Sequence, residues 1–198
     1  MTTSPYRLFL LAGLCLTLQA CQKKQQDTTH TADSATATGQ PVAPNVDYAP
    51  EPMPAQLAEL GLTRDSHWRG INLGDPFSAV GEHEAGKPFE QDAQHVGYTV
   101  DFKNLESADM LYYQQSGKVS RIEVDLFLNS RAAVQTYTRE LTPYFSTRYG
   151  TPATSAGTTT WLGTDGARVT LKDVSKGKDF GLKITFSPQN GGATASAR

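Results

Sequence analysis

Several segments of the chain alternate apolar and polar residues along their length. The clearest are residues 98–102, 121–128, 167–172 and 180–186, in which every second side chain is apolar. Successive side chains of a strand point to opposite faces of a sheet. A period of two repeated over this many segments is typical of an antiparallel sheet with one buried face and one face in water. The pattern therefore predicts a half-buried antiparallel sheet.

Two dipeptides, Ser116-Gly117 and Asp165-Gly166, are typical of the tight turns that join antiparallel strands. Each lies between two segments with strand character. The strands that we expect them to join are 110–115 with 119–128, and 158–162 with 167–172.

One strong amphipathic helix is expected between the two groups of strands. Ser130 is a natural N-cap, and Gly150 with Pro152 ends the helix. Pro143 interrupts the pattern and should kink the helix or split it after Leu141. The apolar stripe repeats at intervals of three and four residues and consists of Val134, Tyr137, Leu141, Tyr144 and Phe145.

Two shorter helices are also expected. One covers residues 76–82, with Asp75 as its cap and Pro76 in its first turn, and the other covers residues 56–60. The complete set predicts an α+β fold, with an antiparallel sheet of six to seven strands packed on one long helix and one or two short ones. Residues 68–73 are the candidate for an added edge strand. The order of elements also suggests two tandem α-β-β-β halves, although no residue-level repeat supports a duplication.

The stretch that opens the second helix resembles the start of the domain shared by small SmpA/OmlA-type envelope lipoproteins and β-lactamase-inhibitor-like proteins. There an isoleucine, a glycine three residues later and a valine six residues beyond it open a helix, as Ile71, Gly74 and Val80 do here. That family often closes the helix with Leu-Gly-x-Pro, whereas residues 81–83 read Gly-Glu-His in this chain. The resemblance implies a protein that binds other proteins and catalyses nothing.

The first 21 residues resemble the signal segment of a bacterial lipoprotein. Arg7 precedes an apolar run, residues 8–18, that is shorter than the roughly 20 residues of a membrane-spanning helix. The residues 18–21, Leu-Gln-Ala-Cys, resemble a lipobox, so residues 1–20 would be a signal peptide and Cys21 the lipidated residue. Gln22, rather than Asp, implies an outer-membrane protein facing the periplasm. The alternatives are an ordinary secretory signal with a chance cysteine and a short membrane anchor.

Composition divides the rest of the chain. Residues 21–54 are rich in Gln, Thr, Ala, Ser and Pro, and contain one aromatic residue, Tyr48. Such a segment buries too little apolar area to offset its ordering entropy, so we expect a lipidated, disordered tether. Residues 55–188 then form the globular domain, and residues 189–198 a disordered tail.

Charge is distributed unevenly along the domain. The formal charge of -2 argues against a nucleic-acid-binding protein, which would usually carry a basic surplus. Residues 82–109 are mainly acidic, whereas residues 168–183 are mainly basic. The basic stretch is a candidate surface for an acidic partner or anionic head groups, and exposed aromatic residues would extend it. The alternatives are a solvated surface and aromatic residues covered by the long helix. The candidate partner-binding residues are Arg168, Lys172, Lys176, Lys178, Lys183, Tyr113 and Trp161.

No catalytic motif is evident. Residues 82–84, Glu-His-Glu, together with Asp92 and His95 are rich in metal ligands, but Lys87 stands where a zinc-protease motif needs its second histidine. A solvated loop is the preferred interpretation and a loop-built zinc site the alternative. Glu123 and Asp125 lie about 7 Å apart on one strand face, which is more typical of a wet face than of an acid/base pair.

We therefore expect a non-enzymatic, lipid-anchored protein-binding module of the bacterial cell envelope, acting as an assembly scaffold or an inhibitor. Its expected partners are the membrane, through the lipid, and a protein. We expect no cofactor and no nucleic acid. One rival hypothesis is a periplasmic immunity lipoprotein that neutralises a toxin or enzyme. The other is an enzyme with a loop-built site.

Overall fold

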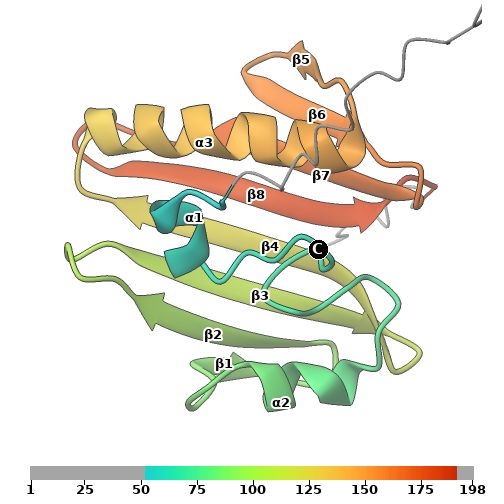
Figure 1. Ribbon diagram of the computed structural model, residues 1–198. Helices are drawn as coiled ribbons and strands as arrows, with labels where there is room; N and C mark the ends of the chain where they lie inside the picture. The colour runs from blue at the N-terminus through green and yellow to red at the C-terminus, as the bar shows by residue number, and fades with distance from the viewer. Residues whose placement is uncertain (1–51, 191–198) are drawn as a thin grey trace, which may run out of the picture. The chain divides into compact units, whose positions relative to one another are not determined.

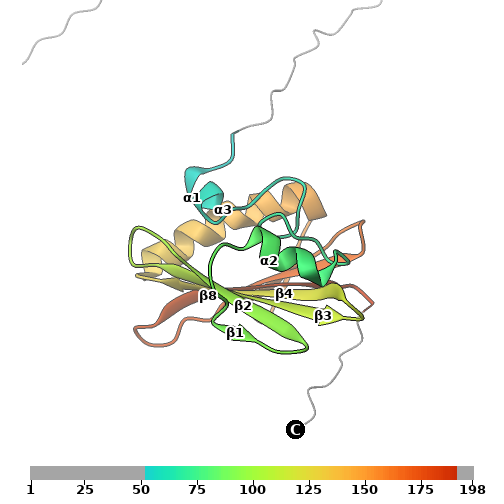
Figure 2. The ribbon, with the colours of Figure 1, turned by 90° about the horizontal axis from the view of Figure 1, so that it is seen from below.

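Eight antiparallel strands form one sheet in the computed structural model, which describes residues 52–190 (Figure 1). The helices of this part of the chain all lie on one side of the sheet (Figure 2). The expected signal peptide 1–20, the lipidation site Cys21, most of the tether 21–54 and the tail beyond residue 190 lie outside the described residues.

The bounds of the elements are as follows. The helices are α1 (Ala55–Glu59), the 3-10 helix η1 (Phe77–Ala79), α2 (Val80–His83) and α3 (Arg131–Tyr149). The strands are β1 (Glu90–Gln91), β2 (His95–Asp101), β3 (Ser107–Gln115), β4 (Lys118–Leu128), β5 (Ala153–Ser155), β6 (Thr158–Leu162), β7 (Ala167–Asp173) and β8 (Phe180–Pro188).

The strand order across the sheet is β1-β2-β3-β4-β8-β7-β6-β5. The first four strands form one meander and the last four another, and the two meanders meet where β4 pairs with β8. The expectation of an α+β fold with an antiparallel sheet is confirmed, but the expected six to seven strands is wrong. The edge strands β1 and β5 have only two and three residues, which is too short for an alternating pattern to be visible in the sequence.

Both hairpins expected from the turn dipeptides are confirmed. Strand β3 pairs with β4 around Ser116 and Gly117, whose φ angles of 54° and 75° suit a tight turn with both central residues in the left-handed region. Strand β6 pairs with β7 around residues 163–166, and Gly166 has a φ of 83°.

The long helix is confirmed, and its beginning is the expected one. The Ser130 hydroxyl accepts a hydrogen bond from the Ala133 N–H at 3.1 Å. The split predicted at Pro143 is wrong, because α3 continues to Tyr149. Pro143 is exposed, so the carbonyl that loses its partner, four residues earlier, can be hydrated.

The shorter elements differ from expectation in detail. Helix α1 is confirmed within one residue, whereas residues 77–83 form the 3-10 turn η1 followed by α2. Asp75 does not cap this helix; its carboxylate accepts a hydrogen bond from the Asn72 N–H at 2.7 Å, and Pro76 occupies the N-cap position. The edge strand predicted at residues 68–73 is wrong. Only a single bridge joins Trp68 and Ile71, and the segment is a loop with both side chains in the core.

The core lies between the sheet and the helices. The stripe Val134, Tyr137 and Leu141 of α3 is buried over the central strands, and one face of β4, with Ile122 and Val124, is fully buried. Aromatic rings continue this layer toward the end of α3, where the Phe145 ring lies 5.3 Å from that of Trp161 and 5.8 Å from that of Phe186, between ring centroids.

The folded region extends slightly beyond the expected limits of 55 and 188. Met53 is partly buried against the core. Gln189 was expected in the disordered tail, but its N–H donates to the Gly166 carbonyl at 2.8 Å. Within residues 52–190, none of the helices combines the length and the apolar composition needed to cross a membrane.

Candidate functional site

The face of the sheet opposite the helices is not covered by any other element in the described part of the chain (Figure 2). Strand pairing aligns its side chains in rows that run across the strands. The longest polar row contains, in order, Thr99, Asp109, Asp125, Lys183, Lys172, Thr158 and Ser155. We call this surface the open face.

The open face is divided by charge. Asp109 on β3 lies directly opposite Asp125 on β4, and Lys183 on β8 lies directly opposite Lys172 on β7. Like charges at directly opposed positions of antiparallel strands are unfavourable. Within this row, the acidic residues belong to the first meander and the lysines to the second, and they meet where β4 pairs with β8.

Lys183 joins the two halves. Its ammonium lies 3.1 Å from an Asp125 carboxylate oxygen and 3.2 Å from one of Glu123. Burial alone would lower the pKa of Lys183, but the hydrogen bonds and attraction of Asp125 and Glu123 outweigh burial and raise it. Glu123 and Asp125 do share one face, as their spacing indicated, and there they bind a lysine.

The basic residues predicted from sequence lie on the hairpin formed by β7 and β8. Arg168 and Lys172 are exposed on β7, and Lys176 and Lys178 are exposed in the loop that follows it. Lys183 is half-buried and engaged in the two ion pairs described above, so the exposed positive charge of this hairpin comes from the other four residues.

The two predicted aromatic residues have different environments. Trp161 is fully buried beneath α3, and its indole N–H donates to the Ser146 hydroxyl at 3.0 Å. Its assignment to a binding surface is therefore wrong, because its strand position points to the helix side. Tyr113 lies on the open face, where the Arg121 guanidinium carbon lies 3.8 Å from the ring centroid.

Two further apolar residues are exposed, and sequence reasoning missed the second of them, Leu105. Phe127 is 50% exposed at the end of the open face, and Leu105 is 94% exposed in the β2–β3 turn. Phe127 alternates with the buried residues of β4, so strand parity predicts that it lies on the open face. Nothing in the sequence distinguishes Leu105 from a core leucine.

The structure separates the histidines that sequence analysis considered for a metal site. His95 lies on the β1–β2 hairpin, with its ring nitrogens 2.8 Å from a Glu90 oxygen and 3.0 Å from an Asp92 oxygen. His83 ends α2 on the helix side of the sheet, and its neighbour Glu84 is buried. Among residues 52–190, no three His, Cys, Asp or Glu side chains are arranged to hold a metal ion.

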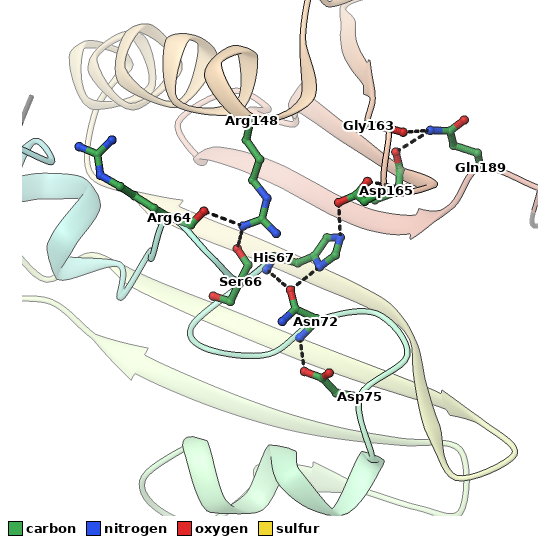
Figure 3. Close-up of polar contacts among 10 residues, drawn as sticks. Arg64, Ser66, His67, Asn72, Asp75, Arg148, Gly163, Asp165 and Gln189 are labelled. Carbon is green, nitrogen blue, oxygen red and sulfur yellow. Dashed lines mark hydrogen bonds and ion pairs between the residues drawn. The ribbon is translucent and has the colours of Figure 1, made fainter. Parts of the chain in front are cut away.

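A polar centre built around His67 lies at the end of α3 (Figure 3). The Asn72 side-chain oxygen lies 3.0 Å from His67 N and 2.8 Å from His67 Nδ1. The Asn72 side-chain oxygen can only accept a hydrogen bond, so Nδ1 of the neutral His67 ring carries the proton. The other ring nitrogen, Nε2, lies 3.6 Å from a carboxylate oxygen of Asp165. Burial is the main cause that lowers the pKa of His67. Arg148 donates to the Ser66 carbonyl in the same centre.

These contacts fasten the loop of residues 63–75 to the end of α3 and to the β6–β7 turn. His67 is 7% exposed, and no Ser, Thr or Cys in the described chain donates a hydrogen bond to its ring. A buried neutral histidine without a nucleophile suits a structural role better than catalysis.

Comparison with known proteins identifies no relative of the chain: no family model matches, and neither curated proteins nor solved structures give a match.

Proposed function

We propose that the protein is a non-enzymatic, lipid-anchored protein-binding module of the bacterial cell envelope, an assembly scaffold or an inhibitor. The lipobox-like residues before Cys21 support an anchor in the outer membrane that faces the periplasm. The folded domain supplies the open face as the surface for a protein partner. We also propose that the two meanders, each preceded by a helix, are duplicated units, because the strand order is the same when read outward from the central pair.

The charge row of the open face carries this proposal. Two acidic residues and two lysines occupy adjacent positions, each like-charged pair directly opposed, although alternating signs would be more favourable. Lys183 and Asp125 compensate each other at the centre of the row, which leaves Asp109 on one side and Lys172 on the other for a partner. A partner with the opposite polarity would be steered into one orientation on this row.

The shape of the surface agrees with a protein partner. It is a broad sheet face, and it presents two aromatic rings, those of the half-buried Tyr113 and the exposed Phe127, beside charged side chains. Aromatic and arginine side chains on a surface of this kind are typical of protein interfaces.

Site-specific photocrosslinking in intact cells tests the proposal. A photoreactive residue at Thr99 or Arg168, both exposed on the open face, should give one or a few defined adducts. The same residue at Arg139, exposed on α3, is the matched control and should not give them. Lys172→Glu should weaken the adducts, and Lys118→Glu, at the start of β4 and the opposite end of the sheet, should not.

Equal adducts from the helix side and the open face would contradict the proposal. The number of partners distinguishes an inhibitor from a scaffold. A single one-to-one complex would indicate an inhibitor or immunity protein, whereas adducts with several envelope proteins would indicate a scaffold.

A further inference from the structure

One end of the sheet gathers three segments that are distant in sequence. The β2–β3 turn contacts the end of β4, where the Asn129 side chain donates to the Asn104 carbonyl. The start of α3 contacts the end of β7 through an ion pair between Arg131 and Asp173. Figure 1 shows the β2–β3 turn, the start of α3 and the β7–β8 loop together at this end. We call this end of the sheet, with the β2–β3 turn, the start of α3 and the β7–β8 loop, the basic end, after the lysines described below.

Leu105 at the basic end combines exposure with an unfavourable backbone. Its side chain is 94% exposed, and its φ angle is +61°, in the left-handed region that glycine and asparagine adopt more readily than leucine. Neither packing nor conformation favours leucine at this position. Strained residues that are held by their surroundings are concentrated at functional sites.

The turn that carries Leu105 is held in place on both sides. The Phe102 N–H donates to the Glu106 carbonyl at 2.8 Å, and the buried Glu106 carboxylate accepts from the Asn129 N–H at 3.2 Å. The backbone that presents the apolar side chain to solvent is therefore held in place, so little backbone entropy would be lost when the side chain is buried.

Two further apolar side chains extend this surface. Phe127 lies directly opposite Gly181, and a Cβ atom at Gly181 would lie 3.5 Å from Val174 Cγ2. Phe127 is 50% and Val174 43% exposed. Three of the five large apolar side chains that are exposed in the described chain thus lie at the basic end.

Exposed lysines surround these apolar side chains. Lys103 lies in the β2–β3 turn, Lys172 ends β7, and the loop after it carries Lys176 and Lys178. The acidic residues nearby in sequence are Asp101, Glu106, Asp125, Asp173 and Asp179. Glu106 is buried, Asp125 is paired with Lys183, and Asp173 is paired with Arg131. Protruding apolar tips among lysines are suited to a flat anionic surface. The lysines would be attracted to lipid phosphates while the tips enter the boundary between head groups and acyl chains.

We propose that the basic end docks reversibly on an anionic membrane surface and so orients the domain relative to the bilayer. The three apolar side chains come from a turn, a strand and a loop at one end of the sheet. This inference does not require a protein partner on the open face, although Phe127 and Lys172 belong to both surfaces.

Vesicle co-sedimentation tests it on the soluble chain 48–198, which contains the complete sheet and core and lacks the acylation site. Binding is expected to vesicles that contain phosphatidylglycerol, to weaken as salt rises, and to be absent with phosphatidylcholine alone. Leu105→Asn should reduce binding several-fold without lowering the thermal midpoint, since asparagine tolerates the positive φ. The double variant Lys176→Glu/Lys178→Glu should reduce it about tenfold or more.

The matched controls are Leu162→Asn and Lys118→Glu. Both residues are exposed, and both lie at the opposite end of their strands, so these variants should bind vesicles as the unsubstituted chain does. Equal binding to anionic and neutral vesicles, or undiminished binding by Leu105→Asn, would overturn the proposal. So would an absence of vesicle binding accompanied by loss of a crosslinked protein partner in Leu105→Asn, which would assign the leucine to a protein pocket.

Discussion

The Nε atom of Arg69 lies 3.1 Å from both carboxylate oxygens of Glu84, whose side chain is only 1% exposed. The Tyr112 hydroxyl donates to the same carboxylate from β3. Burial is the main cause that raises the pKa of Tyr112, and Glu84 adds to it. The loop before η1, the end of α2 and the sheet are therefore joined through one buried charge.

Removal of the arginine should leave that charge without compensation. We expect Arg69→Met to lower the free energy of unfolding by about 3–5 kcal/mol. Urea denaturation measures the change. Arg131→Met is the matched control, because the ion pair of Arg131 with Asp173 is roughly half exposed and should contribute about 1 kcal/mol or less. If the two variants lose equal stability, the Glu84 pair is not a buried charge pair in solution.

Truncation of the α3 stripe should create a cavity. Leu141 is fully buried, and Leu141→Ala should lower the free energy of unfolding by about 2–5 kcal/mol. Leu162→Ala removes the same atoms from a side chain that is 55% exposed, and should change it by no more than about 0.5 kcal/mol. A thermal midpoint unaffected by Leu141→Ala would show that α3 does not cover the sheet as described.

Acidification should destabilise the fold through His67. Burial lowers the folded-state pKa of His67 below the ordinary value of 6.5. The unfolded chain therefore takes up a proton first, and stability is lost as the pH falls through about 6.5 toward the folded-state pKa. The thermal midpoint should fall between about pH 7.5 and about pH 5, and His67→Gln should make that fall shallower. His83→Gln, at an exposed position, should retain it; identical slopes for both variants would exclude His67 as the cause.

Relief of the backbone strain at Leu105 should stabilise the domain. Because asparagine adopts positive φ more readily than leucine, Leu105→Asn should raise the free energy of unfolding by up to about 1 kcal/mol. Leu162→Asn lies in the regular strand β6, where asparagine is disfavoured, and should give no gain. Denaturant midpoints compare the two, and a loss of stability in Leu105→Asn would mean that the leucine side chain has a packing role.

Acylation should depend on Cys21. Cys21→Ser should leave an unprocessed precursor or move the protein to the soluble fraction, because stable anchoring needs two or more acyl chains on this residue. Cys15→Ser, within the apolar run, should be processed normally. Cell fractionation and intact mass test both, and an unchanged mass and membrane fraction for Cys21→Ser would exclude a lipoprotein.

The sequence by itself determined the local structure of this domain. Alternation identified the long strands, the turn dipeptides identified the hairpins around Ser116 and Asp165, and a stripe of five apolar residues identified α3 with its Ser130 cap. These features depend on backbone conformation and on which face of one element is apolar, and both are encoded within a few residues. The same reasoning does not work for β1 and β5, which are defined only by the strands next to them.

Only the tertiary structure decided which faces are covered and which charges meet. Tryptophan is a residue type that often anchors protein interfaces, but α3 packs over the face of β6 from which Trp161 projects. Asp109 and Lys172 are far apart in sequence, and they enter one row because β4 pairs with β8. Pro143 remains inside a helix because packing of its neighbours Leu141 and Phe145 offsets the local cost. Such outcomes depend on contacts between distant segments, whose energies no local pattern contains.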